Sequence, residues 1–330
     1  MSQAWYLVSR PAGMPTMENF ALRDVPASPL AAGEVRIANR WVSVDPYMRG
    51  RMNEGKSYVP PYALDAPMEG GAVGEVIESA SSDFVPGDKV LHMGGWRDEA
   101  VLPATEVEKL PADLGVSDTA WLGMLGLPGF TAWFGLLSIA SAKPGDIVFV
   151  SAAAGAVGSA VVQIAKAKGM TVIGSAGGPE KCAWVREIGA DAVIDYKEEG
   201  SLVRKLRTVA PNGIDVYYDN VGGDHLDAAI ALSNDHARFA ICGMTSIYNG
   251  GGATQLRYAP KIIGSRIRIE GFIYSDFEAR RPEFLQGMTE LLKSGKITTR
   301  ETIHEGLAAM PDAFIGLFSG GNTGKMLVKI

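Results

Sequence analysis

Residues 147–158 read IVFVSAAAGAVG, and this stretch decides the fold class. The apolar β-forming run Ile147–Val150 leads directly into a turn of small residues, Ala152-x-x-Gly155-x-x-Gly158, and the helix-like segment SAVVQIAKAKG follows. A strand, a glycine turn and a helix in this order place a dinucleotide pyrophosphate on a helix N-terminus. Alanine at 152 replaces the usual first glycine, which predicts a slightly wider turn. The alternative is a tight β–α turn without a ligand.

The next strand predicts which dinucleotide binds. An acidic residue usually follows the glycine motif by about 20 residues and accepts hydrogen bonds from a free ribose 2′-hydroxyl. Here the chain reads Ser175-Ala176-Gly177-Gly178, followed by Lys181. Small residues and a lysine favour a 2′-phosphate, so we predict NADPH as the cofactor. Lys181 also has a plainer interpretation as an exposed lysine near a helix start, where a cation is slightly unfavourable. Tyr196 is a candidate hydrogen-bond donor to the same phosphate.

The pattern of apolar runs changes near residue 121. Before it, short strand-like runs alternate with turn signals; these runs are Trp5–Ser9, Glu34–Val42, Gly71–Ser79 and Lys89–His92. After it, strand-like runs alternate with amphipathic segments, which predicts βαβ units and a parallel sheet. The predicted strands are Ile147–Ser151, Thr171–Ser175, Ala192–Ile194, Asp215–Asp219, Arg238–Cys242 and Arg266–Phe272, and the predicted helices are Ser159–Lys168, Glu180–Ile188 and Gly200–Val209.

This alternation ends near residue 296. A final strand-like run, Lys325–Ile330, is predicted to rejoin the first domain. We therefore expect an α/β protein of two domains. A β-rich domain spans 1–122 together with 297–330, and a doubly wound dinucleotide-binding domain spans 123–296.

Composition limits the classes of protein that fit. The chain has 330 residues, a net charge of −6 and two cysteines, Cys182 and Cys242, too few for a disulfide framework. Nothing here predicts a nucleic-acid surface, a signal peptide or a membrane span. We expect a cytoplasmic protein whose partner is a small molecule. Cys242 is predicted to be a small buried residue rather than a nucleophile.

Several segments resemble the zinc-free medium-chain dehydrogenase/reductases, in particular the prostaglandin reductase, alkenal double-bond reductase and curcumin reductase group. These segments begin at residue 43 and continue in order to the C-terminus. They are SVDPYMRGRM (43–52), MEGGAVGEV (68–76), LGLPGFTAWFGL (125–136), AAAGAVGSAVVQIAK (152–166), YYDNVGG (217–223), ICGMTSIYN (241–249), EGFI (270–273) and GNTGKMLVK (321–329). The resemblance implies a GroES-like catalytic domain and a Rossmann domain, with the cofactor in the cleft between them.

The resemblance also implies a set of cofactor positions. Lys181, Tyr196 and Asn322 would hold the cofactor, and Phe272 and Tyr274 would frame the nicotinamide. Ala154 stands where relatives often have serine, and Tyr274 where they often have a smaller aliphatic residue. The remaining predicted positions are Leu127, Thr131, Gly155, Val157, Gly158, Gly177, Asn220, Cys242 and Tyr248. From the residues alone, Asn220 is equally a turn residue that caps the following helix.

No metal site is expected. Where zinc-dependent cousins carry Gly-His-Glu, this chain reads Pro67-Met68-Glu69, and no cysteine precedes Cys182. The four histidines have no ligand spacing. The predicted reaction is therefore hydride addition to an activated double bond, such as that of an α,β-unsaturated ketone or aldehyde.

Tyr248 is the candidate that stabilises the resulting enolate and possibly protonates it, and Tyr47 and Tyr58 are candidate contacts to the substrate oxygen. Each tyrosine is equally interpretable as a packing residue. Two other functions remain open: an NADPH-dependent quinone reductase, and a catalytically silent NADPH-binding sensor. Relatives often dimerise through the last Rossmann strand, so we expect a homodimer paired near Arg266–Phe272.

Overall fold

A computed structural model describes residues 2–111, 114–250 and 252–330. The chain divides into two compact units. The first consists of Met1–Leu122 and Glu301–Ile330, and the second of Gly123–Arg300. None of the described helices is long and apolar enough to cross a membrane.

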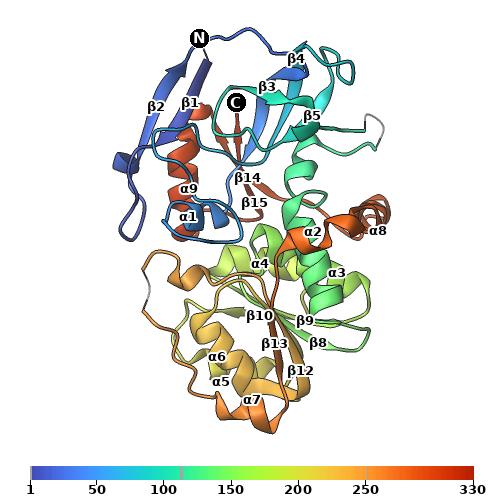
Figure 1. Ribbon diagram of the computed structural model, residues 1–330. Helices are drawn as coiled ribbons and strands as arrows, with labels where there is room; N and C mark the ends of the chain where they lie inside the picture. Colours follow the sequence, from blue (N-terminus) through green and yellow to red (C-terminus); the bar gives the residue numbers. More distant parts are fainter. Residues whose placement is uncertain (1, 112–113, 251) are drawn as a thin grey trace. The chain divides into compact units, whose positions relative to one another are not determined.

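The first unit is built mainly of β-strands (Figure 1). In its described part, the strands are β1 Ser2–Leu7, β2 Phe20–Val25, β3 Glu34–Ser43, β4 Ala72–Ser79, β5 Lys89–His92, β6 Glu99–Pro103, β7 Glu108–Lys109, β14 Glu301–Glu305 and β15 Lys325–Lys329, with helices α1 Tyr47–Arg51 and α9 Met310–Phe318. Among the described strands, β1 pairs only with β2. The other strands form a sheet in the order β14-β15-β3-β4-β5-β7, and β6 pairs with β3.

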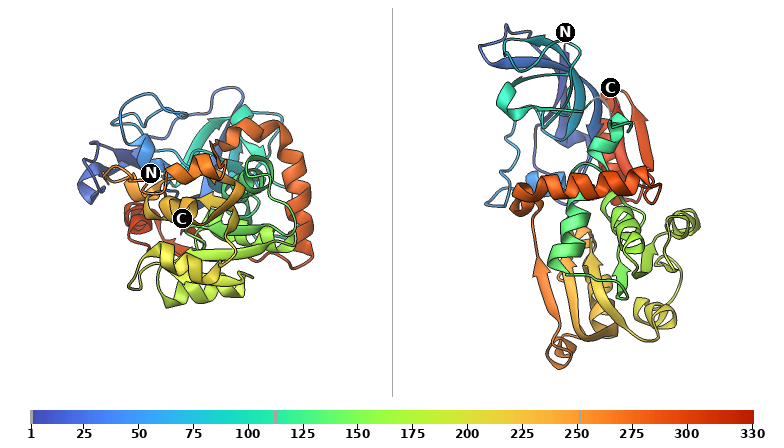
Figure 2. Two further views of the ribbon diagram at one scale, coloured as in Figure 1. Left: turned by 90° about the horizontal axis from the view of Figure 1, so that it is seen from below. Right: turned by 90° about the vertical axis from the view of Figure 1, so that its right-hand side faces the viewer.

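The second unit is a doubly wound parallel sheet in the order β10-β9-β8-β11-β12-β13. Its described strands are β8 Ile147–Val150, β9 Thr171–Ala176, β10 Ala192–Asp195, β11 Ile214–Asp219, β12 Ser233–Ile241 and β13 Arg268–Gly271. Its helices are α2 Leu127–Phe134, α3 Ala156–Ala167, α4 Pro179–Glu187, α5 Leu202–Val209, α6 Gly223–Leu232, α7 Pro260–Gly264 and α8 Arg281–Lys293. Helices α3 and α4 cover one face of the sheet, and α5 and α6 cover the other (Figures 1 and 2).

The predicted fold class, a β-rich unit followed by a Rossmann unit, is confirmed. The strand order reverses between β8 and β11, since β9 and β10 lie on one side of β8 and β11 to β13 on the other. Ligands of open α/β sheets bind beside the carboxyl ends of the strands at such a reversal. The glycine turn that follows β8 lies at this place.

Several predicted boundaries differ from the structure. The first strand is Ser2–Leu7 rather than Trp5–Ser9, and β13 is shorter than the predicted Arg266–Phe272. Helix α3 begins at Ala156, inside the glycine motif, and not at the predicted Ser159. The prediction missed this start because the N-cap, Gly155, has no polar side chain to mark it.

Several elements have no counterpart among the predicted ones, including β2, β6, β14 and α9. β2 ends in exposed polar residues, and β6 ends in a proline, so neither run alternates cleanly between apolar and polar positions.

A buried ion pair attaches β15 to the first unit. The Lys325 ammonium lies 3.0 Å from the Asp45 carboxylate and also donates to the carbonyl oxygens of Val44 and Met326. The Lys325 side chain is buried, and this burial lowers its pKa while Asp45 raises it. Each charge needs the other, because an unpaired charge in the interior carries a desolvation penalty that no partner offsets.

Replacing Lys325 tests this dependence. Lys325→Met should destabilise the protein by about 3–5 kcal/mol, because Asp45 then stays buried without its cation. Urea unfolding followed by fluorescence measures the loss. The matched control is Lys329→Met, which removes an exposed lysine 3.9 Å from Glu305 and should cost less than about 1 kcal/mol. Adding Asp45→Asn to Lys325→Met should recover part of the loss. Equal effects of the two lysine variants would contradict this account.

Candidate cofactor and active site

The turn between β8 and α3 brings backbone close to backbone. A side-chain carbon on Gly158 would lie 2.2 Å from the carbonyl oxygen of Ala152, so only glycine fits there. No side chain caps α3, whose N-cap is Gly155. The first N–H groups of an α-helix have no partner within the helix and attract anions. Ala154 and Val157 lie in the same loop and first turn. This geometry suits a bound pyrophosphate.

Ala152 adopts a backbone conformation that the sequence did not predict. It has a φ of +48°, in the left-handed region that normally favours glycine. The turn keeps the shape of a glycine turn, and alanine occupies it at the cost of local strain.

A buried carboxylate joins the two strands at the strand-order reversal. Asp219, the last residue of β11, accepts hydrogen bonds from the Tyr217 hydroxyl at 2.7 Å and from the backbone N–H groups of Val221 and Gly222 at 2.9 and 2.8 Å. It also accepts one from Ser151, the residue after β8. Burial raises the pKa of Asp219, while these hydrogen bonds lower it. Sequence reasoning missed both Ser151 and Asp219, because neither belongs to a recognisable spacing.

The Asn220 side chain braces the same place. Its amide donates to the carbonyl oxygen of Ser151 at 2.8 Å, and its backbone N–H donates to the Ser151 hydroxyl at 2.9 Å. The backbone N–H groups of Val221 and Gly222, which precede α6, donate to Asp219 and not to the Asn220 side chain. Asn220 therefore holds the β11–α6 turn against the β8–α3 loop that contains the glycine motif.

Gly177, Lys181 and Tyr196 gather beyond the carboxyl ends of β9 and β10. A side-chain carbon on Gly177 would lie 2.7 Å from the Tyr196 hydroxyl oxygen. Lys181 lies in the first turn of α4, and burial, followed by the charge of Lys197, lowers its pKa. Cys182, also in α4, is buried. The three predicted residues of the 2′-phosphate site therefore share one end of the sheet.

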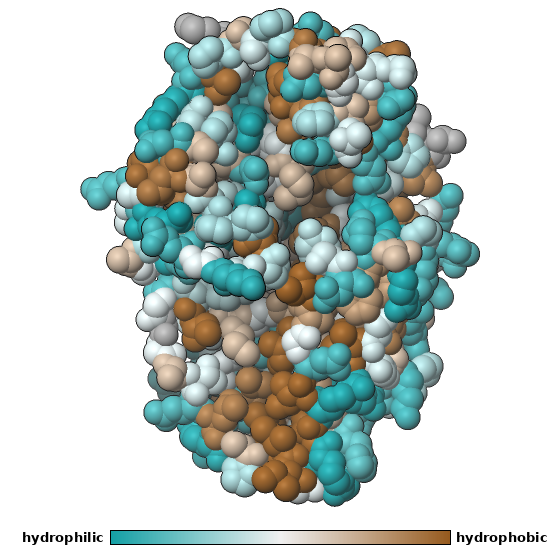
Figure 3. All heavy atoms as spheres, viewed as in Figure 1, coloured by the Kyte–Doolittle hydropathy of each residue, from teal (hydrophilic) through white to brown (hydrophobic). Residues whose placement is uncertain are grey.

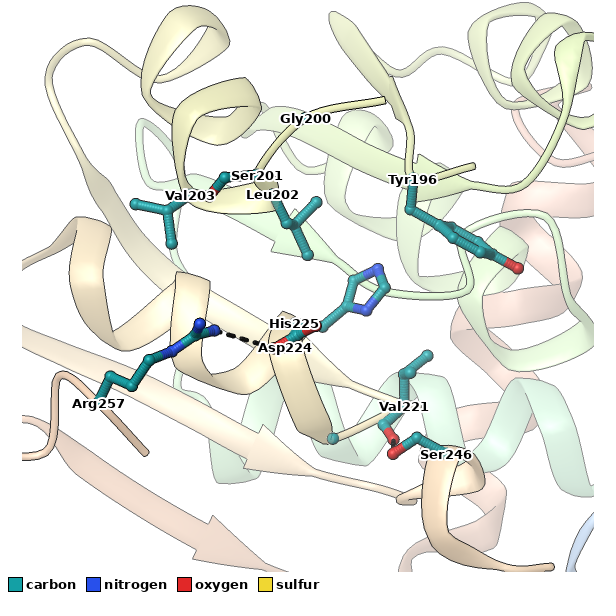
Figure 4. Close-up of a pocket in the computed structure, with 11 residues that line it drawn as sticks. Tyr196, Gly200, Ser201, Leu202, Val203, Val221, Asp224, His225, Ser246 and Arg257 are labelled. Carbon is teal, nitrogen blue, oxygen red and sulfur yellow. Dashed lines mark hydrogen bonds and ion pairs between the residues drawn. The ribbon is translucent and has the colours of Figure 1, made fainter. Parts of the chain in front are cut away.

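A cavity of about 380 Å³ opens beside Tyr196 (Figure 4). Leu202, Val203 and Val221 give it an apolar wall. Its remaining lining residues are Gly200, Ser201, Gly222, Asp224, His225, Ser246 and Arg257. Burial lowers the pKa of His225 to about 4, so the ring is neutral at physiological pH.

Tyr248 lies near the carboxyl end of β12. Its hydroxyl is placed over Gly243, where a side-chain carbon would come within 3.1 Å of the oxygen. Burial raises the pKa of Tyr248, while a hydrogen bond with the Met244 backbone lowers it. Cys242 is partly rather than fully buried, which differs from the prediction. Desolvation still raises its pKa to about 12, so the thiol stays protonated and is a poor nucleophile.

Four predicted cofactor residues surround α2. Leu127 begins this helix, and the carbonyl oxygen of Thr131 accepts a hydrogen bond from the Tyr218 hydroxyl at 2.9 Å. The Phe272 ring packs edge-on against Tyr218, and the Tyr274 ring packs edge-on against Phe130. Thr131 and Phe272 therefore contact one tyrosine of β11.

The remaining predicted residues belong to the first unit. Tyr47 begins α1, Tyr58 is 57% exposed, and the Asn322 amide donates to the carbonyl oxygen of Gly324. A cluster beside Tyr47 had no assigned role. In it, the Arg51 guanidinium lies 2.7 Å from Glu69 and 4.1 Å from the centre of the Tyr62 ring. Met68, at the position of the missing histidine, is buried. Among the described residues, no three His, Cys, Asp or Glu side chains are grouped to hold a metal ion.

The backbone strain at Ala152 can be tested by replacing Ala152 and its neighbour Ala153 with glycine, which should change the free energy of unfolding in opposite directions. Ala152→Gly should raise the free energy of unfolding by roughly 0.5 kcal/mol, because glycine removes the left-handed strain at the cost of a more flexible unfolded chain. Ala153→Gly, which lacks a positive φ and is fully buried, should lower it by about 1 kcal/mol. Thermal unfolding measures both. The same sign for both variants would show that the turn is unstrained.

Known proteins resemble this chain over its whole length. Residues 3–110 match a family model described as the N-terminal domain of oxidoreductase, and residues 156–294 match one described as a zinc-binding dehydrogenase. The NADPH-dependent curcumin reductase of Escherichia coli is 40% identical, over 100% of this chain and 97% of its own. Prostaglandin reductase 1 of Rattus norvegicus is 40% identical, over 99% of both chains.

A solved structure is equally similar. CurA from Vibrio vulnificus in complex with NADPH is 42% identical, covers 99% of this chain and 98% of its own, and has a TM-score of 0.93. The chain belongs to the medium-chain dehydrogenase/reductases, in the group that contains the prostaglandin reductases, 2-alkenal reductases and curcumin reductases.

Proposed function

We propose that this protein is an enzyme that uses NADPH to reduce the C=C bond of α,β-unsaturated ketones and aldehydes. Relatives of about 40% identity over the full chain are named curcumin reductase and prostaglandin reductase, and a third is named 2-alkenal reductase. The structural observation that carries the proposal is the Tyr248 hydroxyl. It lies over a glycine, in the unit that contains the dinucleotide turn, and it stays protonated.

The residues present fit NADPH. The start of α3 has no side-chain cap, its N-cap is Gly155, and only glycine fits at 158. These features suit the pyrophosphate. Tyr196 supplies a hydroxyl beside Gly177, and Lys181, in the first turn of α4, supplies a cation for the 2′-phosphate. We also assign Asn322 to the cofactor, on the resemblance alone.

The cavity beside Tyr196 has the character of an adenine site. Leu202, Val203 and Val221 offer an apolar wall to a flat ring. Neutral His225 lies edge-on to Tyr196, with ring centres 5.5 Å apart, and hydrogen-bonds with Ser175. Tyr196 lines this cavity, and its hydroxyl lies beside Gly177. An adenine in the cavity would therefore place the phosphate on the adjacent ribose carbon near that hydroxyl.

When bound, NADPH supplies a hydride to the substrate's β-carbon. The π electrons of the C=C bond then shift toward the carbonyl oxygen, where negative charge accumulates as an enolate. Tyr248 donates a hydrogen bond to that oxygen, and its raised pKa keeps the proton on the hydroxyl while it does so. The α-carbon then takes a proton from Tyr248 or from water. Tyr47 and Tyr58 are proposed further contacts to the substrate oxygen.

Removing the Tyr248 hydroxyl tests this role. Tyr248→Phe should lower kcat for an enone by about 100-fold, because one donor to the developing charge is lost, and should leave the Kd for NADPH unchanged. Loss of NADPH absorbance measures turnover, and a binding titration measures Kd. The matched control is Tyr258→Phe, a half-exposed tyrosine of the same unit, which should change neither value.

A quinone acceptor separates the alternatives. Quinone reduction needs no enolate donor, so the Tyr248→Phe effect should be confined to enones. Wild-type turnover of quinones alone would make this protein a quinone reductase. NADPH binding without turnover of any acceptor would make it a sensor. An unchanged kcat for an enone in Tyr248→Phe would remove this residue from the mechanism.

We also propose a homodimer that forms across β13. This strand is at the edge of the sheet and pairs only with β12 among the described strands. Apolar side chains gather where α7 and β13 lie (Figure 3), including Ile263, which is 83% exposed, and Ile269. An exposed strand edge beside apolar surface suits pairing about a two-fold axis.

Light scattering after size exclusion should give twice the mass of one chain. Ile269→Lys should shift the population toward monomer, because it places a charge in the proposed contact, while Ile77→Lys, on an exposed position of the first unit, should not. A monomeric wild-type protein would exclude the dimer. The cytoplasm is the proposed location, because both cysteines are free thiols.

A further inference from the structure

We propose that Lys197 is a second cationic ligand of the ribose 2′-phosphate and that it contributes to the preference for NADPH over NADH. The proposal rests on the proposed function, in which NADPH is the cofactor. The sequence prediction assigned this phosphate to Lys181 and Tyr196 and gave Lys197 no role.

The register of the sheet brings Lys197 to this place. β10 runs parallel to β9 with Asp195 opposite Ala176, and the Tyr196 backbone N–H donates to the carbonyl oxygen of Ala176. The residues that follow the two strands therefore lie side by side. A side-chain carbon on Gly177 would meet the Tyr196 hydroxyl oxygen at 2.7 Å and the Lys197 Cε at 3.0 Å. A hydroxyl and the end of a lysine side chain thus converge on one bare backbone position.

Tyr196 is oriented toward this cluster and away from the cavity. Figure 4 shows its hydroxyl directed away from Leu202 and Val203, which line the far side of the cavity. A ribose beside Tyr196 would present its adenine to the cavity and its 2′-phosphate to the hydroxyl and to Lys197.

The neighbouring charges leave Lys197 available. The carboxylate of Asp195, two residues before Lys197, accepts hydrogen bonds from the backbone N–H groups of Gly178 and Lys197. Lys205, in the following helix α5, donates to the carbonyl oxygens of Asp195 and Glu198 and so anchors the loop. Among the described residues, the Lys197 ammonium forms no ion pair.

Two lysines close together favour a dianion. The charge of Lys197 reaches Lys181, where it adds to burial in lowering the Lys181 pKa. This repulsion is unfavourable until an anion lies nearby. A ribose 2′-phosphate has a second pKa of about 6, so it carries close to two negative charges at neutral pH. NADH offers only a hydroxyl there, so the two lysines distinguish the cofactors by charge.

The test measures binding without turnover. Quenching of tryptophan fluorescence or calorimetry gives the Kd of wild type and variants for NADPH, NADH and 2′,5′-ADP, which carries the phosphate without a nicotinamide. Lys197→Gln should weaken NADPH and 2′,5′-ADP by about tenfold and leave NADH unchanged. Lys197→Glu should weaken the two phosphate ligands further. The matched control is Lys296→Gln, which removes the same charge from an exposed lysine of the same unit and should change nothing.

Each outcome decides the proposal. Equal weakening of NADPH and NADH by Lys197→Gln would mean that Lys197 supports the loop and does not bind phosphate. Unchanged affinities would overturn the proposal directly. If wild type binds NADH as tightly as NADPH, the cofactor assignment itself fails. If wild type prefers NADPH and Lys197→Gln keeps the full preference, only the inference about Lys197 fails. An unchanged melting temperature for Lys197→Gln shows that the variant is folded.

Discussion

The buried carboxylate of Asp219 is the constraint on which the second unit depends. It lies at the end of β11, beside the reversal of strand order, and binds Ser151 at the end of β8. Through Tyr217, Val221 and Gly222 it also fixes the next turn. A polar group buried in this way must keep its hydrogen bonds, because an unpaired one is costly. Together with Asn220, which bonds to Ser151 as well, Asp219 therefore holds the two loops that would contact a dinucleotide beside each other.

Much of this unit could be predicted from local patterns. The run from Ile147 to Gly158 contains a strand, a turn and a helix start within twelve residues, so neighbours in sequence determine it. The small residues at the end of β9 and the nearby Lys181 also predicted NADPH as the cofactor. In contrast, β2 pairs only with β1 among the described strands, β6 pairs with the distant strand β3, and α9 packs against a strand near the C-terminus. Their sequences lack clean periodicity because their partners supply the stability.

The parts of the site that sequence reasoning missed share one physical property. Asp219 and Ser151 bond to each other across 68 positions of the chain, and no spacing rule relates them. The left-handed backbone at Ala152 could not be predicted either, because alanine rarely adopts a positive φ. Lys197 looks like any surface lysine until the parallel register of β9 and β10 places it beside Gly177. The sequence gives the residue types, but only the fold shows which of these residues lie next to each other.

Gly177 has a consequence for how cofactor preference changes in proteins of this kind. Its missing side chain is the space that Tyr196 and Lys197 occupy together. A single methyl group at 177 would displace both without altering any charge in the chain. If these two residues bind the 2′-phosphate as proposed, the preference for a phosphorylated ribose depends partly on a side chain that is absent. A search for its determinants among charged residues alone would pass over the position that permits them.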